Sequence, residues 1–324
     1  MKVSKNYSKY FNGYVPPRSS NTSPGESIDV KENVRFPLPF QPPFLFLEFK
    51  TFKINHIKKT PNRQTQLGWR YDPKYDPEPK PLDEIPEGVK AWLRGEDFVW
   101  EGTSHLPSFK EDTLAYWTAC LTLSRKLVKI FALSLDIDED YFDSRTTYPG
   151  ADGVYNYYPE NSAEEKASNA VGLGSHTDLQ LFTLLWQDMV GGLQVLNKEG
   201  QWIKAKPVEG TIVVNIGDFM MRLCNDRYKS TVHRVYNKSN VERVSMPFFF
   251  GKIHMQLELG FYGQLLMIAG LNFNCVEGVV PSCTSETNPP KYEPISCGEC
   301  KFSSIRRQVI EANHIQRVSD EIPD

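Results

Sequence analysis

The stretch Gly174–Trp186, written GSHTDLQLFTLLW, decides the fold class of this chain. It places two polar side chains, His176 and Asp178, at the start of an otherwise apolar run. Residues two apart on a β-strand face the same side, so both groups point at one spot if the strand has begun there. Burying either group without a partner is costly. The spacing therefore predicts that a partner, such as a metal ion, stands in front of them.

Short apolar segments broken by turns surround this stretch. From Gly153 onward they are VYNYY, LFTLLW, GLQVL, QWIKA, TIVVNIG, TVHRVY and RVSMPFFF. The turn Asn197–Gly200 separates two of them as in a β-hairpin. Many short strands at this spacing are typical of an all-β sandwich or barrel. The sequence predicts a mainly β fold with helices packed outside it.

The clearest helical pattern runs from about Ser108 to Leu135. Apolar residues recur along it with helical spacing, whereas charged residues lie off that stripe. A second short helix is predicted at Asp138–Phe142, and a short amphipathic piece at Val89–Leu93. These helices precede the strands, so we expect them to cover the β-domain from outside.

Composition narrows the class of protein and its partners. The chain has 324 residues, a net charge of -3, 40% hydrophobic and 24% charged residues, which is ordinary for a globular protein. The net charge is close to zero, so the composition gives no sign of the positive surface that nucleic-acid binding needs. No apolar run is long enough to span a bilayer. The six cysteines are scattered, and the opening residues lack a signal-peptide core. We expect a cytoplasmic protein that acts on a small molecule, without nucleic-acid or membrane partners; the oligomeric state stays open.

His233, in the segment KSTVHRV, is the candidate for a third ligand beside His176 and Asp178. Two histidines and one carboxylate on one face form the facial triad of non-haem Fe(II), which leaves coordination positions open for substrate and oxygen. From this spacing alone, a hydrogen-bonded surface pair is the simpler alternative. The remaining histidines lack an acidic neighbour at this spacing and are interpreted as structural or surface residues: His56, His105, His254 and His314.

Two further pairs alternate onto one face of a strand. Arg243 and Ser245 combine a guanidinium and a hydroxyl, which suit the distal carboxylate of a small dicarboxylate. Asn156 and Tyr158 could hydrogen-bond a keto acid. Taken alone, the first pair is equally a surface arginine at a strand end, and the second an amphipathic strand edge that ends at Pro159.

The order of these motifs is more specific than any one of them. NYYP, HTD, GGLQVL, NIGDFMMRLCNDRYKSTVHRV and RVSMPFFF together resemble the Fe(II)- and 2-oxoglutarate-dependent oxygenases of the isopenicillin-N-synthase-like type, especially their fungal members. The resemblance covers Trp69–Gly251 almost without a gap. It implies a double-stranded β-helix, or jelly roll, with iron held by His176, Asp178 and His233.

The resemblance also implies the chemistry. The co-substrate 2-oxoglutarate would chelate iron and reach Arg243 and Ser245, with Asn156 and Tyr158 alongside. Reaction with O2 would yield succinate and carbon dioxide and would hydroxylate, desaturate or cyclise a small organic molecule, with ascorbate as a candidate reductant. Members of this family act in secondary metabolism, and nothing in the sequence selects the substrate.

Three alternatives accompany this interpretation. The first is an oxidase of the same fold that does not use 2-oxoglutarate. The second is an inactive, truncated relative that only binds metal or ligand. The third, a zinc hydrolase with the same histidines and aspartate, is disfavoured because it leaves Arg243 and Ser245 unexplained.

Three segments depart from the family pattern, at residues 34–68, 252–270 and 300–324. We therefore expect a partial N-terminal region at 1–140, a jelly-roll domain at 141–299 and an atypical tail, with insertions at the first two segments. The three segments start at the pairs VR, GK and CK, which the splice-donor sequence GTAAG can encode. Our hypothesis is an incomplete or mis-spliced gene model that retains introns and starts late; the alternative is a set of lineage-specific loops.

Overall fold

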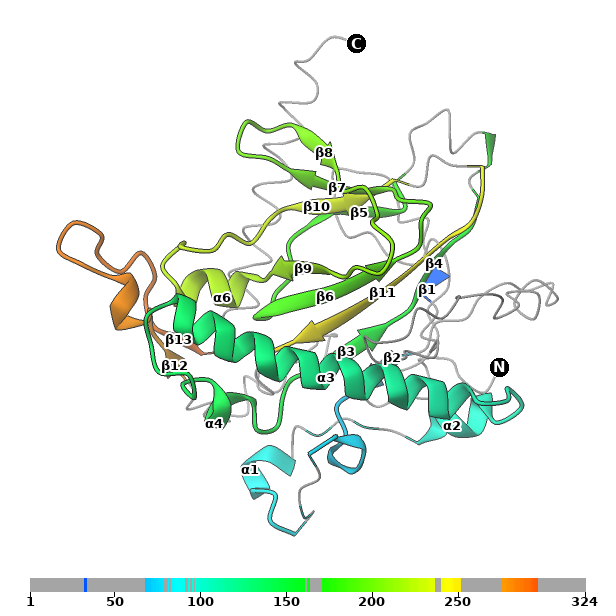
Figure 1. Cartoon of the computed structure of the whole chain (residues 1–324), viewed down its shortest axis with the longest axis horizontal. Coiled ribbons are helices and arrows are strands. Elements are labelled where there is room, and N and C mark those ends of the chain that lie inside the picture. Colours follow the sequence, from blue (N-terminus) through cyan, green and yellow to red (C-terminus); the bar gives the residue numbers. More distant parts are fainter. Residues whose placement is uncertain are drawn as a thin grey trace, which may run out of the picture.

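The computed structural model describes residues 32–33, 68–78, 81, 83–90, 93, 95, 97–160, 162–163, 171–236, 240–251 and 276–296. Two antiparallel sheets lie over one another, with helices against the outer face of the larger sheet (Figure 1). This arrangement, together with the structural neighbours reported below, confirms the predicted mainly β jelly roll with flanking helices.

The larger sheet has seven strands, and β11 (Arg243–Phe250) runs through its middle. The strands β6 (Phe182–Gln187) and β9 (Val213–Ile216) lie on one side of β11. On its other side follow β4 (Asn156–Tyr158), β3 (Asp152–Val154), β1 (Glu32–Asn33) and β2 (Gly68–Arg70). The smaller sheet contains, in spatial order, β5 (Leu173–His176), β10 (His233–Val235), β7 (Leu193–Leu196) and β8 (Trp202–Lys204).

The remaining elements are α1 (Glu87–Lys90), α2 (Phe98–Thr103), α3 (Phe109–Ser134), α4 (Asp143–Thr146), α6 (Asp218–Leu223) and the small ribbon of β12 (Val276–Glu277) and β13 (Ile295–Ser296). The predicted long helix is confirmed as α3. The predicted hairpin is also confirmed, since β7 pairs with β8 around Asn197–Gly200.

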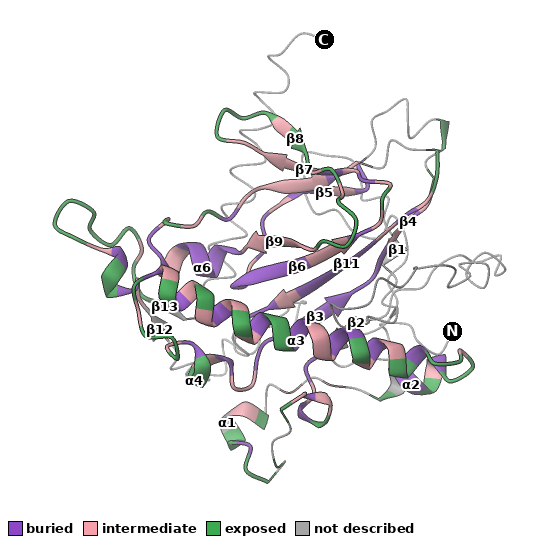
Figure 2. Ribbon diagram, viewed as in Figure 1, coloured by how far each residue is buried: buried purple, intermediate pink, exposed green. Residues whose placement is uncertain are grey.

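Alternation along β11 separates the core from the site. Its even-numbered residues Met246, Phe248 and Phe250 are buried in the core beneath α3, where Trp117 contacts Phe248 at a ring-centroid distance of 5.1 Å. Its odd-numbered residues face the space between the sheets instead. Figure 2 shows the resulting buried layer along β6, β11 and the inner side of α3. The same strand thus supplies core on one face and functional side chains on the other.

Two local predictions are wrong. The segment Asp138–Phe142 forms turns, and the short helix α4 begins one residue later, at Asp143. The single strand predicted over VYNYY is interrupted at Tyr155. By the flanking register, Tyr155 lies opposite Met246 of β11, next to Pro247, which has no backbone N–H to donate to a neighbouring strand.

The strands β1 and β2 follow one another along a single edge of the larger sheet. Asn33 lies opposite Asn156, and Gly68 lies opposite Val154, two register positions further on. Gly68 therefore occupies the place that the second residue after Asn33 would have in an uninterrupted strand. Apart from Gly68, the predicted insertion 34–68 lies outside the described residues, as do 252–270 and 300–324.

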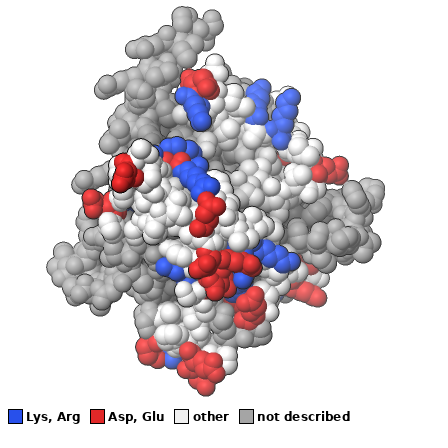
Figure 3. All heavy atoms as spheres, turned by 60° about the vertical axis from the view of Figure 1, so that its left-hand side comes forward, with Lys and Arg blue, Asp and Glu red and all other residues white. Residues whose placement is uncertain are grey.

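The surface carries both signs of charge. On the face in Figure 3, Lys and Arg groups are interspersed with Asp and Glu groups, as the net charge of -3 suggests. Within the described part of the chain, no helix combines the length and the apolar character needed to cross a bilayer.

Candidate metal and co-substrate site

The two histidines of the predicted triad lie side by side in the smaller sheet. His176 in β5 is the direct register partner of His233 in β10, and their ring centroids are 4.3 Å apart. Each Nδ1 lies close to a backbone carbonyl two residues earlier, at 2.8 Å from Gly174 and 3.0 Å from Thr231. A carbonyl only accepts, so Nδ1 carries the proton in both rings. The two Nε2 atoms are thereby directed toward Asp178.

Asp178 reaches the histidines from a loop rather than from their sheet. The condition that one strand carries both His176 and Asp178 is not met, because β5 ends at His176 and the chain then crosses to β6 of the other sheet. The carboxylate Oδ1 nevertheless lies 3.9 Å from Nε2 of His176 and 3.8 Å from Nε2 of His233. One ligand atom from each residue falls within 4.8 Å of the others, a spacing that suits a single metal ion.

The outer oxygen of Asp178 is held by two neutral donors that the sequence reasoning missed. Thr183 Oγ1 and Asn215 Nδ2 each donate to Oδ2 at 2.7 Å, and these two residues are register partners on β6 and β9. Burial raises the pKa of the Asp178 carboxyl, but the neighbouring histidines and these hydrogen bonds outweigh burial and keep the pKa below its ordinary value. Oδ2 is thus occupied, and Oδ1 is left to face the histidines.

A signal for both donors exists in the sequence. Each is a polar residue at an inward position of an otherwise apolar strand, in LFTLLW and IVVNIG. Such a residue needs a hydrogen-bond partner, but the local pattern does not say which partner it finds.

Arg243 is fully buried, and neutral acceptors hold its guanidinium. Nε donates to the carbonyl of Gly191, Nη1 to Ser245 Oγ at 3.2 Å, and Nη2 to Gln187 Oε1 at 3.1 Å. Among the described residues, none brings a carboxylate oxygen within 4.0 Å of this guanidinium. Asp188 interacts electrostatically with Arg243 but does not contact the guanidinium. Because a buried charge without a counter-ion in contact is costly, this end of the site is suited to an anion.

The remaining predicted pair lies next to this guanidinium. Tyr158 is the register partner of Arg243, and Asn156 is the register partner of Ser245. The guanidinium carbon lies 4.8 Å from the centroid of the Tyr158 ring, and both Tyr158 and Asn156 are buried. The structure therefore brings all four residues of the two pairs together.

A glycine pair in GGLQVL explains part of this geometry and was also missed as functional. Gly191 and Gly192 have φ of +82° and +95°, a region that other residues rarely adopt. A Cβ on Gly192 would lie 2.5 Å from the carbonyl oxygen of Tyr236. The tight turn lets the Gly191 carbonyl reach Arg243, so the glycines are required by close backbone approach.

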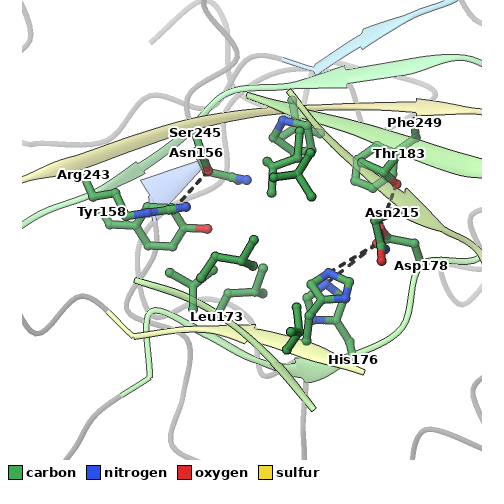
Figure 4. A pocket seen from close by; sticks show the side chains of 18 residues that line it. Asn156, Tyr158, Leu173, His176, Asp178, Thr183, Asn215, Arg243, Ser245 and Phe249 are labelled. Atoms are coloured by element: carbon green, nitrogen blue, oxygen red, sulfur yellow. Dashed lines mark hydrogen bonds and ion pairs between the residues drawn. The ribbon is translucent and has the colours of Figure 1, made fainter. Parts of the chain in front are cut away.

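The triad and the arginine line one cavity of about 250 Å³ between the two sheets (Figure 4). Figure 4 shows Arg243, Ser245 and Tyr158 toward one end and His176 and Asp178 toward the other.

The larger sheet lines this cavity with side chains in cross-strand rows. Ser245 and Asn156 form a polar row on β11 and β4, and Thr183 and Asn215 form another on β6 and β9, beside Phe249 of β11. An apolar row lies between them, formed by Pro247, Leu185 and Val213. The cavity is therefore polar at both ends and apolar in the middle.

These residues fit an iron ion and a keto diacid. Two imidazoles and one carboxylate form the donor set that non-haem Fe(II) prefers. A buried guanidinium with no carboxylate in contact, at the other end, fits a carboxylate, and the apolar middle fits methylene groups.

Comparison with known proteins shows which family the site region resembles. Residues 152–252 match the model of the 2OG-Fe(II) oxygenase superfamily. The 2-oxoglutarate-Fe(II) type oxidoreductase ppzC of Metarhizium majus is 45% identical over 233 residues, which are 70% of this chain and 57% of that protein. The 2-oxoglutarate-Fe(II) type oxidoreductase hxnY of Emericella nidulans is 40% identical over 189 residues, 58% of this chain and 49% of that protein. This chain thus spans between 49% and 57% of the length of these two curated relatives.

A solved structure agrees with this result. A full-length protein of Neurospora crassa, crystallised in complex with alpha-KG (2-oxoglutarate), superposes with a TM-score of 0.51 and is 31% identical in sequence. The match covers 63% of this chain and 62% of that chain. The matched family model spans the strands that carry the site, and fungal relatives are 40% and 45% identical over the aligned residues, so residues 152–252 of this chain are similar to the 2OG-Fe(II) oxygenase superfamily.

Proposed function

We propose that this chain couples the oxidative decarboxylation of 2-oxoglutarate to the hydroxylation, desaturation or cyclisation of a small organic molecule in secondary metabolism. The observation that carries the proposal is the buried arginine without a carboxylate partner, which shares a cavity with a His-Asp-His cluster. The printed names of the fungal relatives and the co-substrate bound to the Neurospora crassa protein support it.

His176, Asp178 and His233 are the proposed iron ligands. The backbone carbonyls orient both imidazoles, and Thr183 and Asn215 hold the far oxygen of the carboxylate. Asp178 therefore offers one oxygen rather than two, which leaves more coordination positions for co-substrate and O2. When bound, iron with O2 would supply the oxidising chemistry; the protein orients the ligands.

Arg243 and Ser245 are the proposed clamp for the distal carboxylate, with Asn156 and Tyr158 beside it. Three acceptors take up three of the five N–H groups of the guanidinium, so each terminal nitrogen keeps one N–H for the ligand. This buried charge with no carboxylate in contact favours the 2-oxoglutarate enzyme over the same-fold oxidase that does not use a keto acid. It also favours an intact site over an inactive relative.

Anaerobic Fe(II) titration tests this function. Fe(II) with 2-oxoglutarate is expected to produce the weak visible metal-to-ligand charge-transfer band, and Arg243→Ala is expected to weaken it at equal 2-oxoglutarate concentration. Asp178→Ala, which removes an iron ligand, is expected to abolish it. Succinate formation with O2 separates the keto-acid enzyme from the oxidase. Folded protein that binds Fe(II) but shows no band at saturating 2-oxoglutarate would refute the proposal.

We further propose a cytoplasmic setting and an interrupted N-terminal region. Free thiols on Cys120, Cys224 and Cys283 support the first. The two-position spacing of Asn33 and Gly68 along one sheet edge supports residues 34–68 as an insertion between the regions 1–140 and 141–299. Sequencing the spliced transcript tests whether the unusual segments are retained introns. A mature transcript that encodes all three segments would contradict that hypothesis.

A further inference from the structure

Gln187 lies beside the co-substrate arginine but is outside the metal triad. It ends β6, is 8% exposed, and accepts from Arg243 Nη2 through Oε1 at 3.1 Å. Its Nε2 donates to the carbonyl of Ala205 at 3.4 Å. The amide orientation is determined by these partners, because a guanidinium only donates and a carbonyl only accepts.

The position of Gln187 in the sheet ties it to the clamp. Ser245 is its register partner, so Gln187 and Ser245 are neighbours on β6 and β11 and hold different terminal nitrogens of Arg243. Both acceptors are neutral. A glutamate in place of Gln187 would reach the same nitrogen with nearly the same shape, and it would neutralise the guanidinium before any ligand arrived.

We propose that Gln187 is a positioning residue that orients Arg243 without placing a carboxylate against its guanidinium, so that the site selects keto acids with a distal carboxylate. The inference rests on the proposed function and goes beyond it. It assigns the preference for keto acids with a charged distal end to a residue that acts through Arg243. An orienting carboxylate would compete with the ligand, whereas an orienting amide does not.

Two substitutions separate this role from a structural one. Gln187→Leu removes both hydrogen bonds but leaves the positive charge available. Gln187→Glu keeps an acceptor toward Arg243, and the adjacent guanidinium keeps the new carboxylate ionised. If Gln187 only supported the fold, the leucine variant would be the more damaged. If it preserves the charge, 2-oxoglutarate affinity falls in the order wild type, leucine variant, glutamate variant.

Gln194→Glu is the matched control. Gln194 in β7 accepts from Arg234 Nε at 2.9 Å, so the same substitution again places a carboxylate beside an arginine in this domain. Gln194 does not line the cavity, and Arg234 packs over the Trp202 ring at 3.8 Å. This variant should leave keto-acid binding unchanged.

The experiment measures the binding of two keto acids to the Fe(II)-loaded protein without O2. The charge-transfer band is the signal that reports binding. 2-Oxoglutarate carries the distal carboxylate; 2-oxopentanoate has the same chelating head and an uncharged tail. In Gln187→Glu, the dissociation constant for 2-oxoglutarate should rise by about 30-fold or more, as expected when a buried charge partner is lost to the ligand. Binding of 2-oxopentanoate should stay within about threefold of wild type, a change of less than about 1 kcal/mol.

The outcomes distinguish two failures. Wild-type protein that binds iron but not 2-oxoglutarate contradicts the proposed function itself. Wild-type binding together with an unchanged ratio of the two dissociation constants in Gln187→Glu overturns the role of Gln187. If the glutamate variant does not take up Fe(II), the Gln187→Leu variant provides the test. A loss of affinity confined to 2-oxoglutarate supports the inference, and an equal loss for both keto acids overturns it.

Discussion

Thr183→Val isolates one hydrogen bond of the metal site. The substitution removes the hydroxyl that donates to Asp178 Oδ2 at 2.7 Å and keeps a β-branched residue on a buried strand. A hydrogen bond to a charged group contributes roughly 1.5–3 kcal/mol. Asn215 still holds the same oxygen at 2.7 Å, so part of the orientation survives. We expect metal affinity to fall about 10-fold, the lower end of the range for groups that support metal ligands.

The assay is anaerobic calorimetric titration with Fe(II), with Co(II) absorption as a second readout that needs no turnover. Thr113→Val is the control, because Thr113 Oγ1 donates to the Phe109 carbonyl at 2.7 Å inside α3, away from the cavity. The control should lower the melting temperature without changing metal affinity. Metal affinity of Thr183→Val within about twofold of wild type, less than about 0.5 kcal/mol, would refute the idea that this hydroxyl orients the carboxylate.

Three further predictions concern the surrounding scaffold. Gly192→Ala should weaken 2-oxoglutarate binding and lower the melting temperature, since its Cβ would lie 2.5 Å from the Tyr236 carbonyl oxygen at φ +95°; equal binding and stability would contradict this strain. Burial raises the pKa of Asp76, but the hydrogen-bonded Arg125 outweighs burial and lowers it. A lowered folded-state pKa stabilises the fold above the unfolded value of about 3.9, and this stability is lost as the pH falls through the folded value. Asp76→Asn should therefore cost about 3 kcal/mol near pH 7 by breaking the ion pair, and denaturant titrations at about pH 7 and below about pH 4 should show a smaller difference at the acidic end. Burial raises the pKa of Cys120 to about 12, so mass-spectrometric mapping should find it unalkylated by iodoacetamide at about pH 8 in native protein and modified after denaturation.

The local sequence pattern was sufficient to predict structural features that depend only on residues close together in the chain. Period-two alternation places Arg243 with Ser245, and Asn156 with Tyr158, on one face of a strand. The helical stripe predicted α3 nearly to its ends. The same period does not apply to His176 and Asp178, because the chain leaves the strand at His176 to cross between sheets. The residue at which the chain crosses from one sheet to the other depends on where the second sheet lies. Two neighbouring residues do not determine that position.

Strand register determines which distant residues lie opposite one another, and the sequence pattern does not reveal this. It sets His176 opposite His233 and Ser245 opposite Gln187, pairs that lie far apart in the chain. Hydrogen bonds over such separations form only after the sheets have paired, so no local pattern reveals that Gln187 serves Arg243 or that Asn215 serves Asp178. The sequence determined which chemical groups are available and which face of each strand they occupy. The tertiary structure decided which groups meet, because register and sheet packing place distant side chains around one cavity.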